Sequence, residues 1–205
     1  MSEILPEVNA PSEYTVNPKN GLIDPARRCL SPNRDARPAG AALDLVILHG
    51  ISLPPGQFGG GEIEALFLNE LDWDAHPYFA EIRGLRVSAH LLIRRDGEVV
   101  QFVPFIERAW HAGESLFRGR RCCNDFSIGI ELEGEDDTPY DDRQYAVLPA
   151  VLQALSDAYV DITADNLRGH CDVSPGRKSD PGPAFDWRRL YDALGEQFEN
   201  NHSCT

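Results

Sequence analysis

The sequence predicts a single α/β domain in which one mixed β-sheet is flanked by α-helices. Three features of the chain favour this fold class: short apolar runs typical of strands, longer amphipathic segments typical of helices, and an irregular alternation of the two around one tight turn. A chain of 205 residues can bury one core of ordinary size, but it is too short for two comfortable domains.

The expected strands are short and end at turn residues. Residues 44–49 (DLVILH) form a continuous apolar run that ends at His49, which is the pattern of a buried strand. Residues 87–94 and 99–103 lie on either side of an Asp-Gly pair. Because Asp-Gly tolerates the positive φ angles of a type I′ turn, these two segments are expected to form a hairpin.

A further strand is expected at residues 126–132 (FSIGIEL), where apolar and polar side chains alternate. Glu131 lies on the polar face. Glutamate is a poor strand former, and a buried carboxylate is costly unless it is used. The alternative is an edge strand on which Glu131 is solvated.

Three segments show the spacing of amphipathic helices: one that starts near Glu62, residues 141–160, and residues 187–198. Asp141, with glutamine three residues later, resembles a capping box, and Asp186 is a plausible cap for the last helix. These elements place a domain at residues 21–198, between an N-terminal arm (1–20) and a C-terminal tail (199–205).

Composition excludes several classes of protein. The formal net charge of −14 argues against nucleic-acid binding, which needs a basic surface, and an acidic surface also repels anionic membranes. No run of 18 apolar residues is present, and the acidic start lacks the apolar core of a signal peptide. Five cysteines, an odd number, fit reduced thiols better than a disulfide framework. We therefore expect a cytoplasmic protein.

A candidate metal site involves two distant parts of the chain. His170 and Asp180 lie ten residues apart in a segment (169–183) rich in glycine and proline, whose turns could bring them together. His49 ends the first expected strand and could complete a set of two histidines and a carboxylate. Three protein ligands with an open fourth position are typical of catalytic zinc. The alternative is that these are unrelated polar residues in loops.

Other polar residues allow less specific interpretations. Lys178 could be an ordinary solvated surface lysine. His90 fits a packed core histidine, whereas His111 could lie in a cleft or be structural. Cys171 could suggest a thiol nucleophile, but its side chain should point away from that of the adjacent His170.

Five segments in the same order resemble the cytoplasmic N-acetylmuramyl-L-alanine amidases of the AmpD type, which recycle cell-wall fragments. The similarity extends from about residue 22 to about residue 190. The segments are HGISLPPG with FGG (49–60), VSAH (87–90), RAWHAG (108–113), CNDFSIGIELEG (123–134) and 169–183 followed by FDW (185–187).

The resemblance implies the fold of zinc amidases related to phage lysozyme-type amidases and peptidoglycan recognition proteins. It implies Zn²⁺ on His49, His170 and Asp180, with a zinc-bound water as the nucleophile. It also implies Glu131 as general base and acid, and Lys178 as the group that stabilises the oxyanion. Positions that line the family's substrate cleft correspond to Arg86, Ala109, Trp110 and Phe67.

The implied reaction is hydrolysis of the amide between anhydro-N-acetylmuramic acid and L-alanine. The partner would be a small anhydromuropeptide, and we expect a monomer. Two positions that touch substrate in the family differ, because Gly50 replaces a common asparagine and Cys122 a common arginine. Two rival functions remain: a module that recognises peptidoglycan fragments without cutting them, and a thiol hydrolase that uses Cys171 or Cys123.

Overall fold

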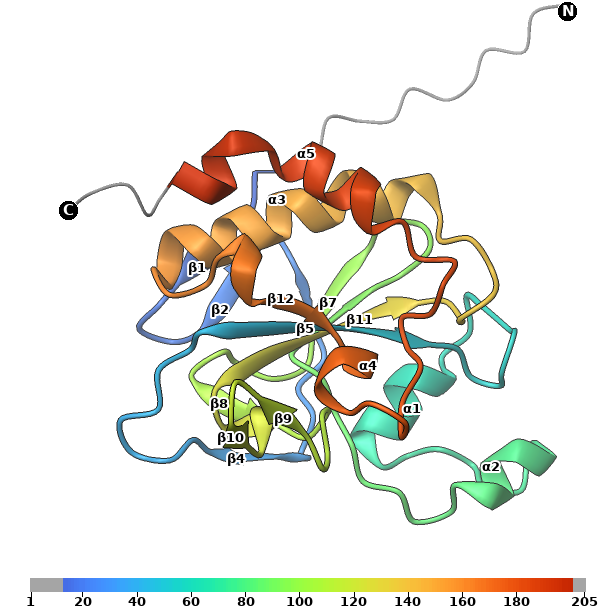
Figure 1. Cartoon of the computed structure of the whole chain (residues 1–205). Helices are drawn as coiled ribbons and strands as arrows, with labels where there is room; N and C mark the ends of the chain where they lie inside the picture. Colours follow the sequence, from blue (N-terminus) through green and yellow to red (C-terminus); the bar gives the residue numbers. More distant parts are fainter. Residues whose placement is uncertain (1–12, 201–205) are drawn as a thin grey trace, which may run out of the picture.

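The computed structural model describes residues 13–200, and its centre is one six-stranded β-sheet (Figure 1). β6 and β7 are antiparallel, whereas all other neighbouring strands are parallel. The predicted α/β domain with one mixed sheet is thus confirmed. Across the sheet the strands are β12 (Leu167–Gly169), β5 (Leu45–Ile51), β11 (Ser127–Glu133), β6 (Leu91–Ile93), β7 (Val99–Gln101) and β3 (Arg27–Arg28).

The two longest strands, β5 and β11, lie next to each other in the middle of the sheet. All seven residues of β11 are buried, because β5 and β6 flank this strand and both faces of the sheet are covered. The alternative of an edge strand with a solvated Glu131 is therefore wrong. Periodicity identified the strand, but it could not show that other elements cover its polar face.

The hairpin expected around residues 96–97 is present as β6 and β7, although both strands are shorter than predicted. Gly97 has a φ of 87°, whereas Asp96 is not among the residues with positive φ. The predicted type I′ turn is wrong, since that turn needs positive φ at both central residues. The Gly97 N–H donates to the Arg94 carbonyl at 2.9 Å and closes the loop instead.

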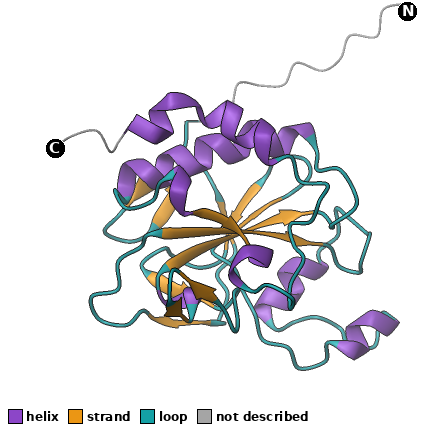
Figure 2. Ribbon diagram, in the orientation of Figure 1, coloured by secondary structure: helices purple, strands orange, loops and turns teal. Residues whose placement is uncertain are grey.

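Two long helices cover one face of the sheet (Figure 2). α3 (Asp142–Ala158) begins with the predicted capping box at Asp141. α5 (Trp187–Asn200) is interrupted at Gly195, and its first turn is capped by Asp186, whose Oδ1 accepts from the Arg189 N–H at 2.9 Å. Even-numbered residues of β5 and β11 pack with these helices to form the largest apolar cluster.

Shorter elements cover the opposite face in two separate clusters. α1 (Glu62–Leu68) and α2 (Pro77–Glu81) pack over the β6–β7 half of the sheet. α4 (His170–Val173) and the loops around residues 112–126 cover the half that includes the start of β5. The gap between the two clusters lies over the ends of β5 and β11, so their odd-numbered side chains point into it.

The remaining elements are short and peripheral. They form three two-stranded sheets and two 3₁₀ helices: β1 (Thr15–Asn17) with β2 (Leu22–Asp24), β4 (Arg34–Ala36) with β8 (Glu107–Ala109), β9 (Leu116–Phe117) with β10 (Arg120–Arg121), η1 (Cys123–Asp125) and η2 (Ala164–Asn166). Within residues 13–200, no helix combines the length and apolarity needed to cross a membrane.

Secondary structure extends beyond residues 21–198 at both ends. β1 lies inside the expected arm of residues 1–20, yet Val16 packs against the main apolar cluster because β1 pairs with β2. At the other end, α5 continues to Asn200, two residues beyond the predicted limit. The rest of the predicted arm (1–12) and tail (201–205) lies outside the described residues.

Candidate metal centre and active site

Two functional candidates lie side by side at the same level of the sheet. In the parallel β5–β11 pair, His49 is the register partner of Glu131. Both are odd-numbered, so their side chains leave the face opposite α3 and α5. Both are also buried, with 2% of His49 and 8% of Glu131 exposed.

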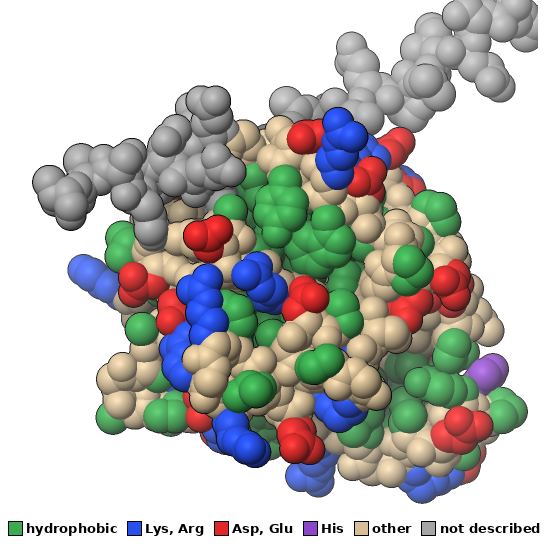
Figure 3. Space-filling model, viewed as in Figure 1, with side chains coloured by type: hydrophobic (Ala, Val, Ile, Leu, Met, Phe, Trp, Pro, Cys, Tyr) green, Lys and Arg blue, Asp and Glu red, His purple; other side chains and the backbone are tan. Residues whose placement is uncertain are grey.

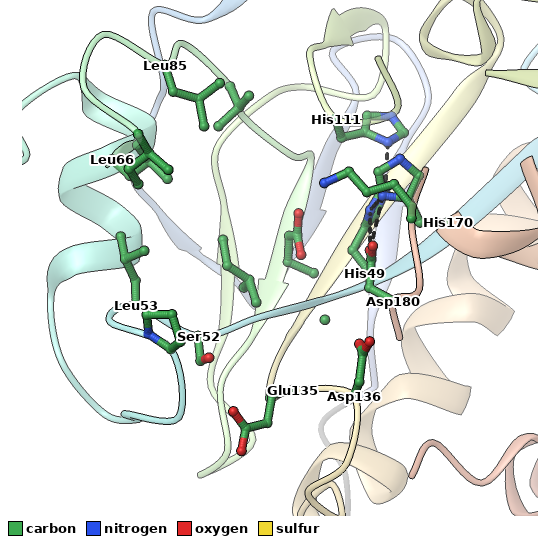
Figure 4. A pocket seen from close by; sticks show the side chains of 18 of the residues that line it. His49, Ser52, Leu53, Leu66, Leu85, His111, Glu135, Asp136, His170 and Asp180 are labelled. Carbon is green, nitrogen blue, oxygen red and sulfur yellow. Dashed lines mark hydrogen bonds and ion pairs between the residues drawn. The ribbon is translucent and has the colours of Figure 1, made fainter. Parts of the chain in front are cut away.

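The three predicted ligands converge at this point (Figure 4). The Nδ1 atoms of His49 and His170 lie 3.0 Å apart, and Oδ2 of Asp180 lies 3.1 Å from each of them. These three residues are the group of potential metal ligands found among the described residues. The turns of segment 169–183 have therefore brought together side chains from two distant parts of the chain.

The protonation of His49 and Asp180 suits metal binding. Burial lowers the pKa of His49 to about 4, so its imidazole is neutral at neutral pH. Burial alone would raise the pKa of Asp180, but hydrogen bonds with His170 and His49 outweigh it and hold that pKa below its ordinary value. Neutral imidazoles and an ionised carboxylate are the ligand forms of these side chains.

The geometry also fits a tetrahedral ion. Nε2 of His170 lies 3.2 Å from the Ala112 carbonyl, which can only accept, and 3.4 Å from the Arg177 guanidinium, which can only donate. The shorter contact favours a hydrogen on Nε2, which leaves a lone pair on Nδ1 facing the cluster. Zinc bonds of about 2.0 Å in a tetrahedron separate ligand atoms by about 3.3 Å. The observed separations of 3.0–3.1 Å are similar. The cluster is thus compatible with a metal site.

Glu131 carries a carboxylate that no described residue satisfies. Its Oε2 atom is buried and has no hydrogen-bond partner among residues 13–200. Burial raises the pKa of Glu131 well above its usual value, the charge of Asp180 raises it further, and Lys178 partly offsets both. A buried carboxyl group with an unpartnered oxygen, beside three potential metal ligands, is suited to accept and return a proton.

Lys178 lines the same cavity and is held there by its loop. Its backbone N–H donates to the Ser174 carbonyl at 3.1 Å. The neighbouring Arg177 donates to the carbonyls of Ala112 and Glu114, at 2.6 and 2.8 Å. The loop that carries Asp180 therefore also carries the cationic side chain of Lys178 to the cavity.

The cavity has a volume of about 610 Å³. From the metal cluster it extends towards α1 and α2, where Figure 4 shows Leu53, Leu66 and Leu85 on its wall. In Figure 3 apolar side chains also gather over α1 and α2. Glu135 and Asp136 form a polar rim beside the cluster. The cavity thus offers reactive groups at one end and apolar surface at the other.

One wall of the cavity is the loop that follows β5, and Glu133 ties this loop to the sheet. Oε1 of Glu133 accepts from the Gly59 N–H at 2.6 Å, and Oε2 accepts from the Arg95 N–H at 3.1 Å. Ser52 and Leu53 of the loop line the cavity. The loop is therefore held in place from within the sheet.

The four residues expected to bind substrate occupy different environments. Phe67 lines the cavity, although only 1% of it is exposed. Ala109 is fully buried in the α1 cluster and Trp110 is half-buried. Arg86 is exposed and lies between two lining residues, Leu85 and Val87. Arg86, Ala109 and Trp110 do not line the cavity as it stands.

The two positions that depart from the family pattern also differ in location. Gly50 lines the cavity, and a Cβ atom added there would collide with the Tyr140 hydroxyl. Cys122 is exposed, has a φ of 60° and does not line the cavity. Only the Gly50 position thus borders the cavity directly.

Sequence reasoning did not single out Tyr140. Its hydroxyl donates to the carbonyl of Pro181 at 2.9 Å, and Pro181 directly follows the candidate ligand Asp180. A Cβ atom on either Gly50 or Gly134 would collide with Tyr140. Glycines within or just after a strand mark a close approach, and these two were the signal available in the sequence.

Comparisons with known proteins identify the family of this chain. Residues 39–183 match the N-acetylmuramoyl-L-alanine amidase family. The 1,6-anhydro-N-acetylmuramyl-L-alanine amidase AmpD of Escherichia coli (strain K12) is 60% identical over 172 residues, which cover 84% of this chain and 93% of that protein. The AmpD of Haemophilus influenzae is 51% identical over 176 residues, covering 86% of this chain and 96% of that protein.

Solved structures give the same result. A crystal structure of a selenomethionine AmpD derivative is 55% identical, covers 87% of this chain and 98% of its own, and superposes with a TM-score of 0.84. The amidase AmiD from E. coli, in complex with anhydro-N-acetylmuramic acid-L-Ala-D-γ-Glu-L-Lys, is 28% identical. It covers 77% of this chain and 60% of its own, with a TM-score of 0.54. The resemblance seen in the sequence is confirmed, and the chain belongs to the N-acetylmuramoyl-L-alanine amidase family.

Proposed function

We propose that this protein is a zinc-dependent amidase of cell-wall recycling. It would hydrolyse the amide bond between 1,6-anhydro-N-acetylmuramic acid and L-alanine. The observation that carries the proposal is the position of the three-ligand cluster beside the unpartnered carboxyl group of Glu131. Amide hydrolysis needs an activated water and a proton for the leaving amine, and this arrangement supplies both.

His49, His170 and Asp180 would hold the zinc ion. When bound, zinc lowers the pKa of a water molecule and polarises the scissile carbonyl. Glu131 takes a proton from the attacking water and gives it to the leaving nitrogen of L-alanine. Its buried position suits this role, because a raised pKa lets the carboxyl group hold the proton between the two steps.

Lys178 would stabilise the negative charge that develops on the carbonyl oxygen. Lys178 lines the cavity on the same loop as Asp180, so that loop supplies a cation beside the candidate metal ligands. A charge that develops in the transition state is stabilised more than the neutral substrate, which favours turnover over ground-state binding.

The relatives support an anhydromuropeptide as the small-molecule substrate. The AmpD proteins of E. coli and H. influenzae are both named for 1,6-anhydro-N-acetylmuramyl-L-alanine, and the AmiD complex holds an anhydromuropeptide. A cavity of about 610 Å³ has the usual size of a small-ligand site. Arg86, Ala109, Trp110 and Phe67 stay predicted contacts. Among them Phe67 has the most direct support, since it lines the cavity.

We also propose a cytoplasmic monomer. Cys29, Cys122, Cys123 and Cys171, the cysteines that the structure describes, are all free, which suits a reducing compartment. Light scattering of the purified protein tests the monomer, and cell fractionation tests the location.

The deciding experiment is mass spectrometry of the products from anhydro-N-acetylmuramic acid-L-Ala-D-γ-Glu-L-Lys, combined with metal analysis. We expect free anhydro-N-acetylmuramic acid and intact tripeptide, with loss of activity in chelator and recovery with zinc. Binding without cleavage would support a recognition module. Activity that resists chelator but is lost on thiol alkylation would support Cys171 or Cys123 as nucleophile.

A further inference from the structure

His111 lies directly behind the metal cluster without belonging to it. Its Nδ1 atom is 2.9 Å from Nε2 of His49, and the two rings are nearly perpendicular at 88°. Figure 4 shows His111, His49, His170 and Asp180 as one connected row. His49 thus contacts His170 and Asp180 through Nδ1, and it contacts His111 through Nε2.

Asn124 and Gly129 hold His111 in its position. Oδ1 of Asn124 accepts from the backbone N–H groups of His111 and Ala112, at 3.2 and 2.8 Å. The ring itself lies over Gly129, where an added Cβ atom would come within 2.5 Å of Cγ and Nδ1 of His111. A side chain at residue 129 would therefore displace the ring.

The hydrogen-bond directions along this row follow from a single carbonyl. Oγ of Ser127 lies 2.6 Å from the Cys123 carbonyl, which can only accept, so the hydroxyl hydrogen points there. Nε2 of His111 lies 3.3 Å from the same Oγ and must then be the donor. A neutral imidazole that donates from Nε2 presents a lone pair at Nδ1.

That lone pair faces Nε2 of His49. Nε2 of His49 therefore carries the hydrogen and donates it to His111, which leaves Nδ1 of His49 unprotonated and facing His170 and Asp180. The other histidine ligand needs no such chain, because His170 donates directly to the Ala112 carbonyl. A backbone carbonyl thus orients His170, whereas the side chains of His111 and Ser127, which mutation can replace, orient His49.

We propose that His111 and Ser127 are positioning residues that fix the tautomer and ring orientation of His49, so that its Nδ1 atom meets the metal. The inference rests on the proposed metal centre and not on the identity of the substrate. Partners that orient metal-bound histidines typically contribute 10–100-fold in metal affinity.

Zinc affinity tests this inference directly, through competition with a chromophoric chelator in the absence of substrate. His111→Phe removes the acceptor and should weaken zinc binding by roughly 10–100-fold. His111→Asn should restore most of the affinity, since its Oδ1 can take the place of Nδ1. Ser127→Ala removes only one oxygen atom and should weaken binding by a smaller factor, of the order of several-fold.

A matched control separates positioning from general loss of stability. Ser31→Ala also removes a buried serine hydroxyl that donates to a carbonyl, that of Phe67, but it lies outside the metal cluster. It should leave zinc affinity unchanged. Nitrogen-15 NMR of the histidine rings adds a second readout: His49 should be protonated at Nε2 in the parent and a mixture of tautomers in His111→Phe.

The outcomes distinguish this inference from the proposed function. A parent protein that binds no zinc would overturn the proposed metal centre. A parent that binds zinc and cleaves the substrate, with unchanged zinc affinity in His111→Phe and Ser127→Ala, would overturn the positioning role alone. If His111→Phe does not fold, the zinc affinity of Ser127→Ala and the tautomer of His49 in the parent protein still test the positioning role.

Discussion

His49 and Glu131 are register partners on adjacent parallel strands, so a candidate metal ligand and a carboxyl group leave the sheet side by side. The backbone ladder sets their relative position, and neither residue depends on a mobile loop for its place. Strand-borne groups are held more accurately than loop-borne ones, which suits a reaction that needs water, carboxyl group and carbonyl in line.

Glu131→Gln should keep zinc but lose most of the turnover, by about 10²–10⁴-fold, because an amide cannot exchange the proton. The same change should raise the unfolding temperature of the metal-free protein at neutral pH. Above the ordinary carboxyl pKa the unfolded chain ionises more readily than the buried Glu131, which lowers the free energy of unfolding, and glutamine removes that effect. Metal analysis, kinetics and thermal unfolding check these points. Loss of zinc would assign Glu131 to the ligand set instead.

We expect one zinc ion per chain, bound by His49, His170 and Asp180. Asp180→Ala removes the charged ligand, so both metal content and activity should be lost, as elemental analysis of the purified variant can show. Asp172→Ala is a suitable comparison, because it changes an aspartate of the same segment that bonds the Gly169 N–H and not the cluster. Freshly purified, active protein without zinc would contradict the metal assignment.

Lys178→Ala should lower kcat by about 10²-fold or more, with zinc content unchanged and only a modest effect on substrate affinity. The reason is that an ammonium group at the carbonyl oxygen acts mainly on the charge of the transition state. Steady-state kinetics with metal analysis tests this, with Lys19→Ala, on an exposed turn, as the control. Turnover within a few-fold of the parent would make Lys178 a bystander.

His90 should make the folded protein sensitive to mild acid. Burial, reinforced by nearby Arg37, lowers the pKa of His90 well below its ordinary value. Below pH ~6.5, His90 is therefore protonated in the unfolded chain but stays neutral in the folded protein. Protonation of His90 in the unfolded chain should therefore lower the free energy of unfolding by up to about 1.4 kcal/mol for each pH unit below this value.

Urea unfolding of the metal-free protein between pH 7.5 and 5.5 measures that slope. His90→Gln should make it shallower. Some slope should remain, because the pKa of His111 is also lowered by burial. An identical slope in the parent and in His90→Gln would show that His90 is protonated in the folded state.

The sequence by itself determined the main elements and pointed to the candidate reactive groups. The apolar run that ends at His49, the alternation around Glu131 and the capping box at Asp141 each appear in the structure with boundaries shifted by only a few residues. These features depend on contacts within one element, where the periods of strand and helix decide which side chains share a face. The candidate ligands could be proposed from the sequence, but their spacing alone also fitted unrelated polar residues in loops, and the family resemblance favoured the metal site.

Tertiary structure alone decided how these groups meet. His49 contacts His170 and Asp180 across 121 and 131 residues of sequence, and His111 across 62. The spacing of apolar residues within one helix or strand does not predict contacts between such distant residues. Glu131 could be read as solvated until the α1 and α4 sides of the sheet enclosed it, and His111 had no defined role until Gly129 left room for its ring. The reason is physical: propensity acts over a few neighbouring residues, whereas burial and hydrogen-bond direction depend on whichever distant segments the packed fold brings alongside.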